Sequence, residues 1–246
     1  MRLDHYLVEH NLAKSRSKAT DLIKRGLVLV DGEVMLKAGY EIKDHIVFVL
    51  ENEQFVSRAG EKLKQALLDF GIDLHGKIVV DVGSSTGGFT DCAIQHGAKE
   101  VYAYDVGTNQ MDENLKKDPK IHLFEGTNIL DVDLPKADVI LIDVSFTSIK
   151  PILAHLVSFQ NEIIALIKPQ FEAGNIHFKQ GVLKDLKKHR EILTSVLEEA
   201  RALGFSIYDL KKSGLKGKQG NQEYVLYIKD TKNEQNIRKL VGDVLC

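Results

Sequence analysis

Residues 79–90 read Val79-Val80-Asp81-Val82-Gly83-Ser84-Ser85-Thr86-Gly87-Gly88-Phe89-Thr90. The apolar beginning predicts a buried strand, the glycines predict a tight turn, and the residues after Gly88 predict the start of a helix. Glycine in such a turn lets a ligand approach the backbone closely, because it has no side chain. A second apolar stretch ends at Asp105, where an acidic residue suits the two hydroxyls of a ribose. Together these features predict a site for a nucleoside-containing cofactor.

The spacing of the glycines narrows the choice of cofactor. A dinucleotide-binding turn has the pattern G-x-G-x-x-G, whereas here Gly83 is followed by three other residues before Gly87 and Gly88. No lysine follows Gly88, so the phosphate-binding pattern G-x-x-x-x-G-K is absent as well. The turn therefore favours a cofactor without a pyrophosphate, and S-adenosylmethionine fits. The alternative is an ordinary strand-to-helix turn that binds nothing.

Composition excludes several classes of protein. The chain has 246 residues, of which 43% are hydrophobic, and a formal net charge of -2. It can therefore bury a sizeable core, and any contact with nucleic acid must come from local basic patches. Its two cysteines, Cys92 and Cys246, are too few for a disulfide framework or a zinc site. No apolar run approaches the roughly 18 residues that a membrane span needs. We expect a cytoplasmic protein without a metal and without a membrane partner.

The first 50 residues have the pattern of a small domain of their own. Apolar residues recur at helical spacing over 2–10, and Ser15 is suited to cap a second helix that Gly26 would end. Asp31-Gly32 lies between two apolar runs, which predicts a β-hairpin. A further strand is expected near 46–50, before a polar stretch. We expect a small α+β domain at 1–50, a linker at 51–60 and a larger domain at 61–246.

The larger domain alternates predicted strands and helices. The strands are expected at 77–82, 100–105, 121–125, 137–143, 161–168, 205–211 and 223–229, and the helices near 58–70, 88–97, 147–157 and 183–203. This alternation predicts an α/β fold with a seven-stranded, mostly parallel sheet and an antiparallel edge. Ligands of such sheets bind at the carboxyl ends of the strands, where Asp81, Gly83, Asp105, Asp143 and Lys168 are expected.

The first domain carries a local excess of positive charge. The candidates for contact with RNA are Arg2, Lys14, Arg16, Lys18, Lys24 and Arg25. Phosphate backbones favour such a stripe because binding releases counterions, although a solvated helix face is the alternative. The segments Arg2-Leu3-Asp4, Ser15-Arg16-Ser17 and Asp31-Gly32 resemble the RNA-binding domain of ribosomal protein S-four. The resemblance implies recognition of structured RNA by shape and backbone.

Four charged residues of the larger domain are candidates for catalysis: Lys62, Asp143, Lys168 and Glu223. Asp143 and Lys168 each end a strongly apolar predicted strand, and a charge placed there is costly unless it is paired. A purely structural ion-pair cluster is the alternative.

These residues and their neighbours resemble the FtsJ-type ribose 2′-O-methyltransferases, which use a Lys-Asp-Lys-Glu tetrad. Both domains together resemble the TlyA (haemolysin A) family, whose members methylate ribosomal RNA. The segments that carry the match are Ser57-Arg58 with Gly60 and Lys62, residues 81–91, Asp143-Val144-Ser145-Phe146 and Lys168-Pro169-Gln170-Phe171-Glu172. The resemblance implies a Rossmann-like class I methyltransferase fold.

The chemistry of ribose methylation suggests a role for each tetrad residue. A ribose hydroxyl is a weak acid, so a lysine that can accept its proton would assist the transfer. We expect Lys168 beside the reacting oxygen and Lys62 in support. Asp143 would orient Lys168, and Glu223 would steady the second lysine or the ribose.

The cofactor site is expected along the turn and the neighbouring strand ends. Asp81 would lie near the methionine amine, Asp105 near the ribose, and Asn128 with Ile129 near the adenine edge. The full set of expected cofactor-binding residues is Asp81, Gly83, Ser84, Ser85, Gly87, Gly88, Phe89, Asp105, Asn128, Ile129 and Asp143. Two further basic tracts, within 179–190 and 211–218, either extend the contact with RNA or are solvated surface.

We therefore expect an S-adenosylmethionine-dependent 2′-O-ribose methyltransferase that acts on structured ribosomal RNA or ribosomal subunits. Two alternatives stay open at this point. One is a methyltransferase that acts on an RNA base, and the other is a non-enzymatic RNA-binding or membrane-lytic protein. Monomer and homodimer are equally compatible with the sequence.

Overall fold

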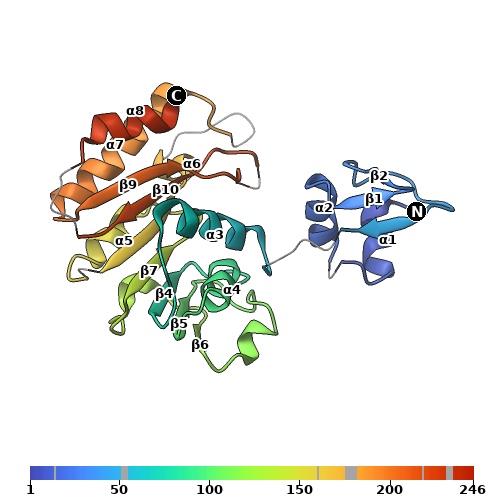
Figure 1. Cartoon of the computed structure of the whole chain (residues 1–246), viewed down its shortest axis with the longest axis horizontal. Coiled ribbons are helices and arrows are strands. Elements are labelled where there is room, and N and C mark those ends of the chain that lie inside the picture. Colours follow the sequence, from blue (N-terminus) through green and yellow to red (C-terminus); the bar gives the residue numbers. More distant parts are fainter. Residues whose placement is uncertain (14, 51–54, 160, 175–181, 218, 231–234) are drawn as a thin grey trace. The chain divides into compact units, whose positions relative to one another are not determined.

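The computed structural model of the chain describes residues 1–13, 15–50, 55–159, 161–174, 182–217, 219–230 and 235–246. The chain forms two compact units, residues 1–54 and 55–246. Figure 1 labels most of the helices and strands of both units. Among the described residues, no helix has both the length and the apolar character that crossing a membrane requires.

The small unit packs two helices against a three-stranded antiparallel sheet. The helices are α1 (Leu3–Glu9) and α2 (Arg16–Lys24), and the strands, in sheet order, are β2 (Glu33–Val34), β1 (Val28–Val30) and β3 (Val47–Val49). Ser15 caps α2 by accepting a hydrogen bond from the backbone of Lys18 at 3.2 Å. Asp31 and Gly32 both have positive φ, as the two central residues of a tight hairpin turn require. The predicted hairpin and helix cap are therefore both present.

The large unit is built on a seven-stranded sheet, with the order β6-β5-β4-β7-β8-β10-β9. The strands are β4 (Ile78–Val82), β5 (Glu100–Tyr104), β6 (Ile121–Phe124), β7 (Val139–Ile142), β8 (Glu162–Ile167), β9 (Ile207–Lys212) and β10 (Tyr224–Ile228). The pairs from β6 through β8 are parallel, and β10 is antiparallel to both of its neighbours. The predicted fold class is confirmed, with the antiparallel strand inserted one place inside the edge.

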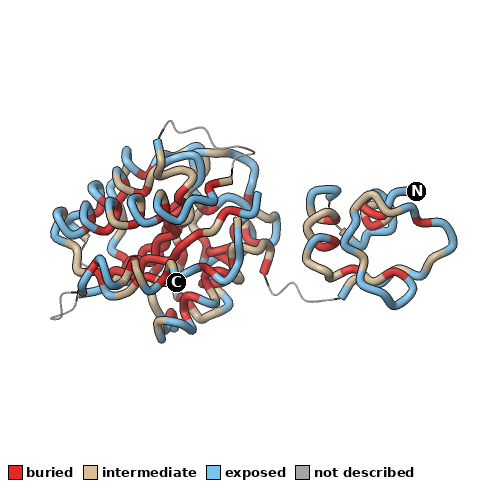
Figure 2. The backbone as a smooth tube through the Cα atoms, turned by 90° about the horizontal axis from the view of Figure 1, so that it is seen from above, coloured by how far each residue is buried: buried red, intermediate tan, exposed pale blue. Residues whose placement is uncertain are grey.

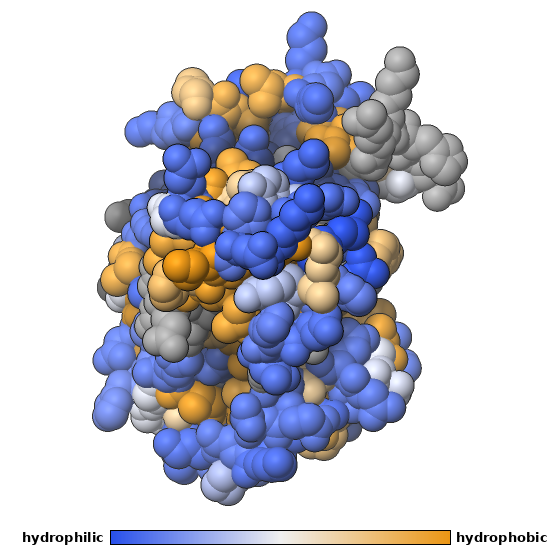
Figure 3. Space-filling view, turned by 90° about the vertical axis from the view of Figure 1, so that its right-hand side faces the viewer, coloured by the Kyte–Doolittle hydropathy of each residue, from blue (hydrophilic) through white to orange (hydrophobic). Residues whose placement is uncertain are grey.

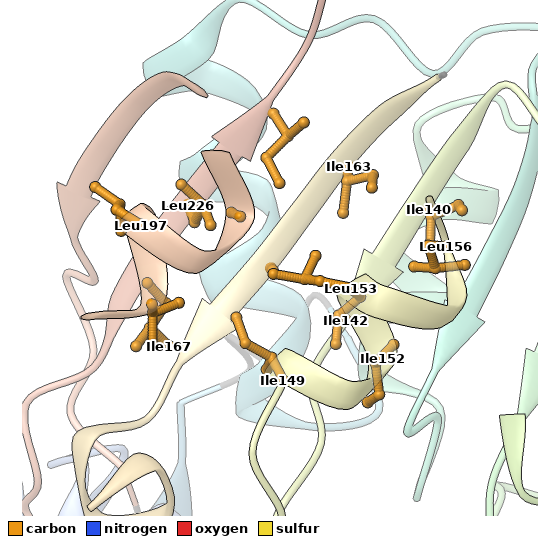
Figure 4. Packing of buried hydrophobic residues seen from close by; sticks show 14 of the residues in the cluster. Ile140, Ile142, Ile149, Ile152, Leu153, Leu156, Ile163, Ile167, Leu197 and Leu226 are labelled. Carbon is orange, nitrogen blue, oxygen red and sulfur yellow. The ribbon is translucent and has the colours of Figure 1, made fainter. Parts of the chain in front are cut away.

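Helices cover both faces of this sheet (Figure 1). On one face, α3 (Arg58–Phe70) and α4 (Gly88–Gln95) pack on a cluster that includes Val79, Leu141 and Leu166. On the other face, α5 (Lys150–His155), α7 (Leu186–Ala202) and α8 (Ile237–Leu245) pack on a second cluster, part of which is drawn in Figure 4. The remaining helices are short: α6 (Pro169–Glu172), η1 (Leu115–Lys117) and η2 (Ile129–Asp131).

Burial follows the strands closely. Figure 2 shows the buried residues concentrated in the interior of the large unit, where the strands run. Strands with helices on both faces become continuously apolar, and β8 is accordingly buried from Ile163 to Ile167. Some apolar residues also reach the surface, and Figure 3 shows such residues among hydrophilic ones.

The second half of the expected linker lies within the large unit. Residues 51–54 fall outside the described part of the chain, but Phe55 is buried in the cluster below α3, and α3 itself begins at Arg58. A Cβ atom on Gly60 would overlap the ring of Phe55, so the chain is closely packed from its first described residue in this unit.

Candidate active site

The glycine-rich turn presses its backbone against the end of the neighbouring strand. Gly83 follows β4 with a φ of +86°, and a Cβ atom there would lie 2.9 Å from the backbone oxygen of Asp143. Gly87 has a φ of +92° and caps α4. Both positions therefore require glycine, for the backbone angle and, at Gly83, also for the space.

Asp105 is tied to this turn by the backbone. Its Oδ2 accepts a hydrogen bond from the backbone of Ser85 at 2.8 Å, and its Oδ1 accepts one from the backbone of Gly107 at 2.7 Å. Ser85 itself adopts a positive φ of 48°. Each carboxylate oxygen keeps a second lone pair, so Asp105 can still accept hydrogen bonds from a ligand at the end of β5.

Asp81 is a fully buried carboxyl group with spare bonding capacity. Its Oδ2 accepts a hydrogen bond from Thr90 at 2.6 Å, while its Oδ1 and the buried hydroxyl of Ser84 have no hydrogen-bond partner among the described residues. Burial raises the pKa of Asp81 to about 7, with a smaller contribution from the charge of Asp143, against the hydrogen bond from Thr90. Such a group would be stabilised by a cationic ligand.

The side chains of three expected cofactor-binding residues make other contacts within the protein. Phe89 packs in the cluster below α3, and Ile129 packs in the cluster on the opposite face of the sheet. The side chain of Asn128 caps η2 by accepting a hydrogen bond from the backbone of Leu130 at 3.1 Å. At Gly88 a Cβ atom would overlap the hydroxyl of Ser57. For Phe89 and Ile129, only backbone groups are left for a ligand.

Three members of the predicted tetrad lie at strand ends on the same face of the sheet. Asp143 follows β7, Lys168 follows β8 and Glu223 precedes β10. Side chains two residues apart on a strand share a face. Since Leu141, Leu166 and Val225 all pack toward α3 and α4, the three charged side chains continue that face, and Lys62 belongs to α3 itself.

The sheet register brings the strand-end residues next to one another. Tyr224 pairs with Ile167 in the antiparallel ladder, so Glu223 and Lys168 stand opposite each other one step further along. Ile142 pairs with Ala165 in the parallel ladder, which places Asp143 beside the end of β8.

The tetrad forms two short ion pairs. Nζ of Lys62 lies 2.5 Å from Oε2 of Glu223, and the two side chains are 9% and 4% exposed. Nζ of Lys168 lies 2.5 Å from Oδ1 of Asp143, with exposures of 8% and 12%. Lys168 also donates a hydrogen bond to the hydroxyl of Ser145 at 3.0 Å. Each charge is thus compensated by one opposite charge.

The two loops that carry Asp143 and Lys168 are joined at three points. Besides the hydrogen bond from Lys168 to Ser145, the rings of Phe146 and Phe171 lie 5.1 Å apart. Glu172 accepts hydrogen bonds from the hydroxyl of Ser148 at 2.5 Å and from the backbone of Ile149 at 2.8 Å.

Two residues of these loops have unusual environments. Burial raises the pKa of Glu172, although hydrogen bonds oppose the shift. Phe146 is 90% exposed and has a φ of +66°, a backbone conformation that is strained for a residue with a bulky side chain. Sequence reasoning assigned no role to Ser145, Phe146 or Glu172, although all three lie in the segments that carried the family resemblance.

The small unit contains a buried carboxylate with two arginines around it. Asp4 is only 4% exposed in its side chain, and it accepts hydrogen bonds from Arg2 at 2.9 and 3.1 Å and from Arg16 at 3.0 Å. The two arginine side chains are 56% and 59% exposed. Asp4 therefore holds two guanidinium groups at the surface, a function that the sequence pattern did not reveal.

The other basic residues expected to contact RNA are arranged less closely. Arg25 forms an ion pair with Asp21 at 3.7 Å, Lys24 is exposed and Lys18 is half-buried. Lys14 lies outside the described residues. Among the described residues, no group of three or more histidine, cysteine, aspartate or glutamate side chains could hold a metal ion.

Comparison with known families and proteins covers nearly the whole chain. Residues 55–230 match the family described as FtsJ-like methyltransferase, and residues 1–45 match the S4 domain. Hemolysin A of Brachyspira hyodysenteriae is 40% identical over 240 residues, which cover 92% of this chain and 99% of that protein. The 16S/23S rRNA (cytidine-2′-O)-methyltransferase TlyA of Mycobacterium tuberculosis is 36% identical over 240 residues, 93% of this chain and 89% of the relative.

The fold also matches a solved structure. A candidate hemolysin from Streptococcus thermophilus superposes with a TM-score of 0.76 and 33% sequence identity, over 99% of this chain and 95% of the other.

Proposed function

The chain belongs to the FtsJ-like methyltransferase family, and from that premise we propose that it methylates a ribose 2′-hydroxyl of structured ribosomal RNA with S-adenosylmethionine. The observation that carries the proposal is the pair of buried ion pairs, Lys62 with Glu223 and Lys168 with Asp143, at the strand ends beside the glycine-rich turn. The related enzyme of Mycobacterium tuberculosis is named for the 2′-hydroxyl of cytidine, and we propose the same type of acceptor here.

The residues around the turn fit the proposed cofactor. The unpartnered Oδ1 of Asp81 and hydroxyl of Ser84 suit the ammonium and carboxylate groups of a bound amino acid moiety. Because Gly83 has no side chain, a ligand can approach the backbone of the turn closely. Asp105 retains lone pairs that can accept hydrogen bonds from the ribose hydroxyls. When bound, the cofactor supplies an electrophilic methyl group on a positively charged sulfur.

Lys168 is the residue that we assign to the proton of the ribose hydroxyl. As the new bond from oxygen to carbon forms, this proton must leave. Lys168 can accept it only as a neutral amine, so its ammonium group first releases a proton to solvent, and the proton taken from the hydroxyl then restores the ion pair with Asp143. Asp143 and Ser145 hold Nζ of Lys168 from two sides, which fixes its position before the substrate arrives. Alignment of the reacting atoms then lowers the barrier further, by up to about 7–11 kcal/mol for well-oriented groups.

Lys62 and Glu223 form the second half of the site. Glu223 forms an ion pair with Lys62 and stands opposite Lys168 in the sheet, so the two ion pairs lie at the same end of β8 and β10. We assign to Lys62 and Glu223 the positioning of the target ribose. The exposed ring of Phe146, supported by Phe171, offers a surface on which a base could stack.

Binding of the RNA is assigned to the small unit and in particular to Arg2 and Arg16. Their guanidinium groups are held by Asp4, but the two side chains remain more than half exposed, so both can still donate hydrogen bonds to phosphate. S4-type recognition of this kind depends on shape and backbone rather than on base sequence.

The test is methyl transfer to ribosomal RNA. Purified protein is incubated with labelled S-adenosylmethionine and ribosomal RNA or ribosomal subunits, and the products are digested to nucleosides. We expect a methyl group on the sugar of one nucleoside. The variant Lys168→Ala should bind the cofactor normally and transfer no methyl group, whereas Lys136→Ala, an exposed lysine before β7, should act like the wild type. A methyl group on a base, or full turnover by Lys168→Ala, would contradict the proposal.

A further inference from the structure

Two basic tracts that are far apart in the sequence meet beside the catalytic cluster. The first contains Lys184, Lys187 and Arg190 near the start of α7, and the second contains Lys212 at the end of β9 and Lys216 after it. All five side chains belong to exposed residues. If hydrogen bonds hold the two tracts next to each other, their basic side chains form one surface and are not two separate solvated segments.

The link is a set of buried hydrogen bonds around Leu183. The backbone nitrogen of Leu183 donates to Oδ1 of Asn221 at 2.9 Å, and its carbonyl oxygen lies 3.0 Å from Nε2 of His189. The other ring nitrogen of His189 lies 2.8 Å from the hydroxyl of Tyr224. Asn221 and His189 are 3% and 2% exposed. The backbone nitrogen of the residue just before Lys184 is therefore fixed to the segment that leads into β10, and its carbonyl oxygen is connected through His189 to Tyr224 of β10.

The second tract is fixed to the same segment. The backbone of Gly217 donates to the carbonyl oxygen of Asn221 at 2.9 Å, and the backbone of Ser213 donates to that of Glu223 at 2.9 Å. These two residues directly follow Lys216 and Lys212. Lys212 also pairs with Tyr224 across the sheet, which places it on the face of α7.

The joined surface borders the proposed site. A Cβ atom on Gly217 would overlap Oε1 of Glu223, so the backbone just after Lys216 lies against the carboxylate that binds Lys62. Lys184, Lys212 and Lys216 each stand next to a residue whose backbone is hydrogen-bonded to the segment that carries Glu223.

Four lysines of this surface have no ion-pair partner within the described residues. Lys184, Lys187, Lys212 and Lys216 form no ion pair there, in contrast to Lys188, which pairs with Glu191 at 2.6 Å, and Lys150, which pairs with Glu199 at 2.9 Å. Exposed lysines that form no ion pair, on backbone segments held by hydrogen bonds, are suited to bind a polyanion.

We propose that Lys184, Lys187, Lys212 and Lys216, which we name the basic rim, bind the RNA phosphates that flank the target ribose. This proposal rests on the proposed function for its substrate. The rim would hold the RNA strand at the large unit itself, next to Glu223, in addition to the contacts made by the small unit. Phosphate contacts of this kind fix the position of a nucleic acid without reading its sequence.

The experiment compares a rim variant with a matched control in the full chain. The rim variant combines Lys184→Gln, Lys212→Gln and Lys216→Gln. The control combines Lys99→Gln, Lys117→Gln and Lys120→Gln, which removes three exposed lysines near the opposite edge of the sheet, at β5 and β6. Both remove three positive charges. Thermal unfolding and S-adenosylmethionine affinity, measured by calorimetry, verify that each variant is folded.

Binding of purified ribosomal RNA is measured by filter retention at several KCl concentrations. Each lost phosphate contact lowers the slope of log affinity against log salt by about 0.7–0.9. We expect the rim variant to bind more weakly, with a slope smaller by about 2–3, while the control stays near the wild type. In methyl transfer, KM for RNA should rise while kcat at saturating RNA stays unchanged. Lys-to-Arg replacements at the three rim positions should restore binding.

The rim proposal is wrong if the rim variant binds ribosomal RNA like the wild type, or if the control loses as much affinity as the rim variant. Failure of the proposed function gives a different result, because the wild type would then transfer no methyl group to ribose. The binding measurement would still compare the rim variant with the control and would test the rim proposal separately.

Discussion

Lys62 of α3 and Glu223 at the start of β10 form a buried ion pair, with Nζ and Oε2 2.5 Å apart, across 161 positions of sequence. Removing one partner leaves an uncompensated charge in the interior, which typically costs about 3–5 kcal/mol. We therefore expect Glu223→Gln and Lys62→Met each to lower the free energy of unfolding strongly, and the double variant to lose less than the sum of the two. Urea denaturation of the four proteins gives the coupling free energy.

Methyl transfer separates the catalytic from the structural role of this pair. If the pair only stabilises the fold, the double variant should recover activity as it recovers stability. We expect no such recovery, because the proposed positioning of the ribose needs the charged groups themselves. Full activity of the double variant would assign the pair to stability alone.

Asp81 should make the stability of the cofactor-free protein depend on pH. Its pKa in the folded protein is raised to about 7 from an ordinary value near 4 by burial. The folded state thus binds this proton more tightly than the unfolded state, so the contribution of Asp81 to stability is fully present below about pH 4 and is lost as pH rises through 7. Asp81→Asn should remove this dependence and melt at a higher temperature than the wild type at about pH 8, and thermal melts across the range measure it.

The same substitution should harm the proposed cofactor site. The affinity of the wild type for S-adenosylmethionine should rise between about pH 6 and 8, since the ionised carboxylate is the form that binds an ammonium group. Asp81→Asn should lose this rise together with most of the affinity. Calorimetric titrations that show an unchanged affinity would exclude Asp81 from the cofactor site.

Substitution of Asp4 distinguishes the effect of net charge on RNA binding from the effect of holding the two arginines in place, because the two effects have opposite signs. Asp4→Asn makes the small unit more positive, which on charge alone would strengthen RNA binding. We expect weaker binding, because Arg2 and Arg16 lose the carboxylate that holds them and would have to be ordered by the RNA. Glu9→Gln removes the same charge from an exposed position on α1 and serves as the control, which should bind ribosomal RNA at least as tightly as the wild type. Tighter binding by Asp4→Asn would contradict the role of Asp4.

We expect Glu172 to help position Lys168 without contacting the substrate. Glu172→Leu leaves the hydroxyl of Ser148 and the backbone nitrogen of Ile149 without their acceptor, at a cost of about 1–3 kcal/mol for the buried backbone nitrogen and less for the half-buried hydroxyl. Since these bonds join the two loops that carry Asp143 and Lys168, kcat should fall while cofactor affinity stays unchanged. Glu198→Gln, an exposed position on α7, is the control. Glu172→Gln, which keeps one acceptor oxygen, should restore part of the rate, and a variant Glu172→Leu with unchanged kcat would remove Glu172 from this role.

Local patterns in the sequence were sufficient to find most elements. The predicted strand at 77–82 corresponds to β4 at Ile78–Val82, and the helix expected at 58–70 has those bounds, because alternation of apolar residues and terminal caps act over a few positions. The helix α8 was not predicted, and neither was the position of β10 between β8 and β9. Strand order depends on contacts between distant segments, which no local pattern contains.

The site shows the same division. Asp143 and Lys168 were found because a charge at the end of an apolar strand is conspicuous in the sequence, whereas Lys62 and Glu223 were assigned to the tetrad through the family resemblance. Their pairing, Lys62 with Glu223 and Lys168 with Asp143, follows from the sheet register and from the face on which α3 packs. The packing of Phe89 and Ile129 in the interior was also not predictable. Each lies beside a turn or a short helix, and at such a position the local sequence is equally compatible with a side chain that packs in the core and with one that contacts a ligand.

The position of β10 has a consequence for synthesis of the protein. The four tetrad residues come from segments that extend from position 62 to position 223, and β10 must be inserted beside β8 before Glu223 can reach Lys62. A nascent chain that still lacks its C-terminal part therefore has no complete catalytic cluster. The cluster can form only after translation of the chain has passed this strand.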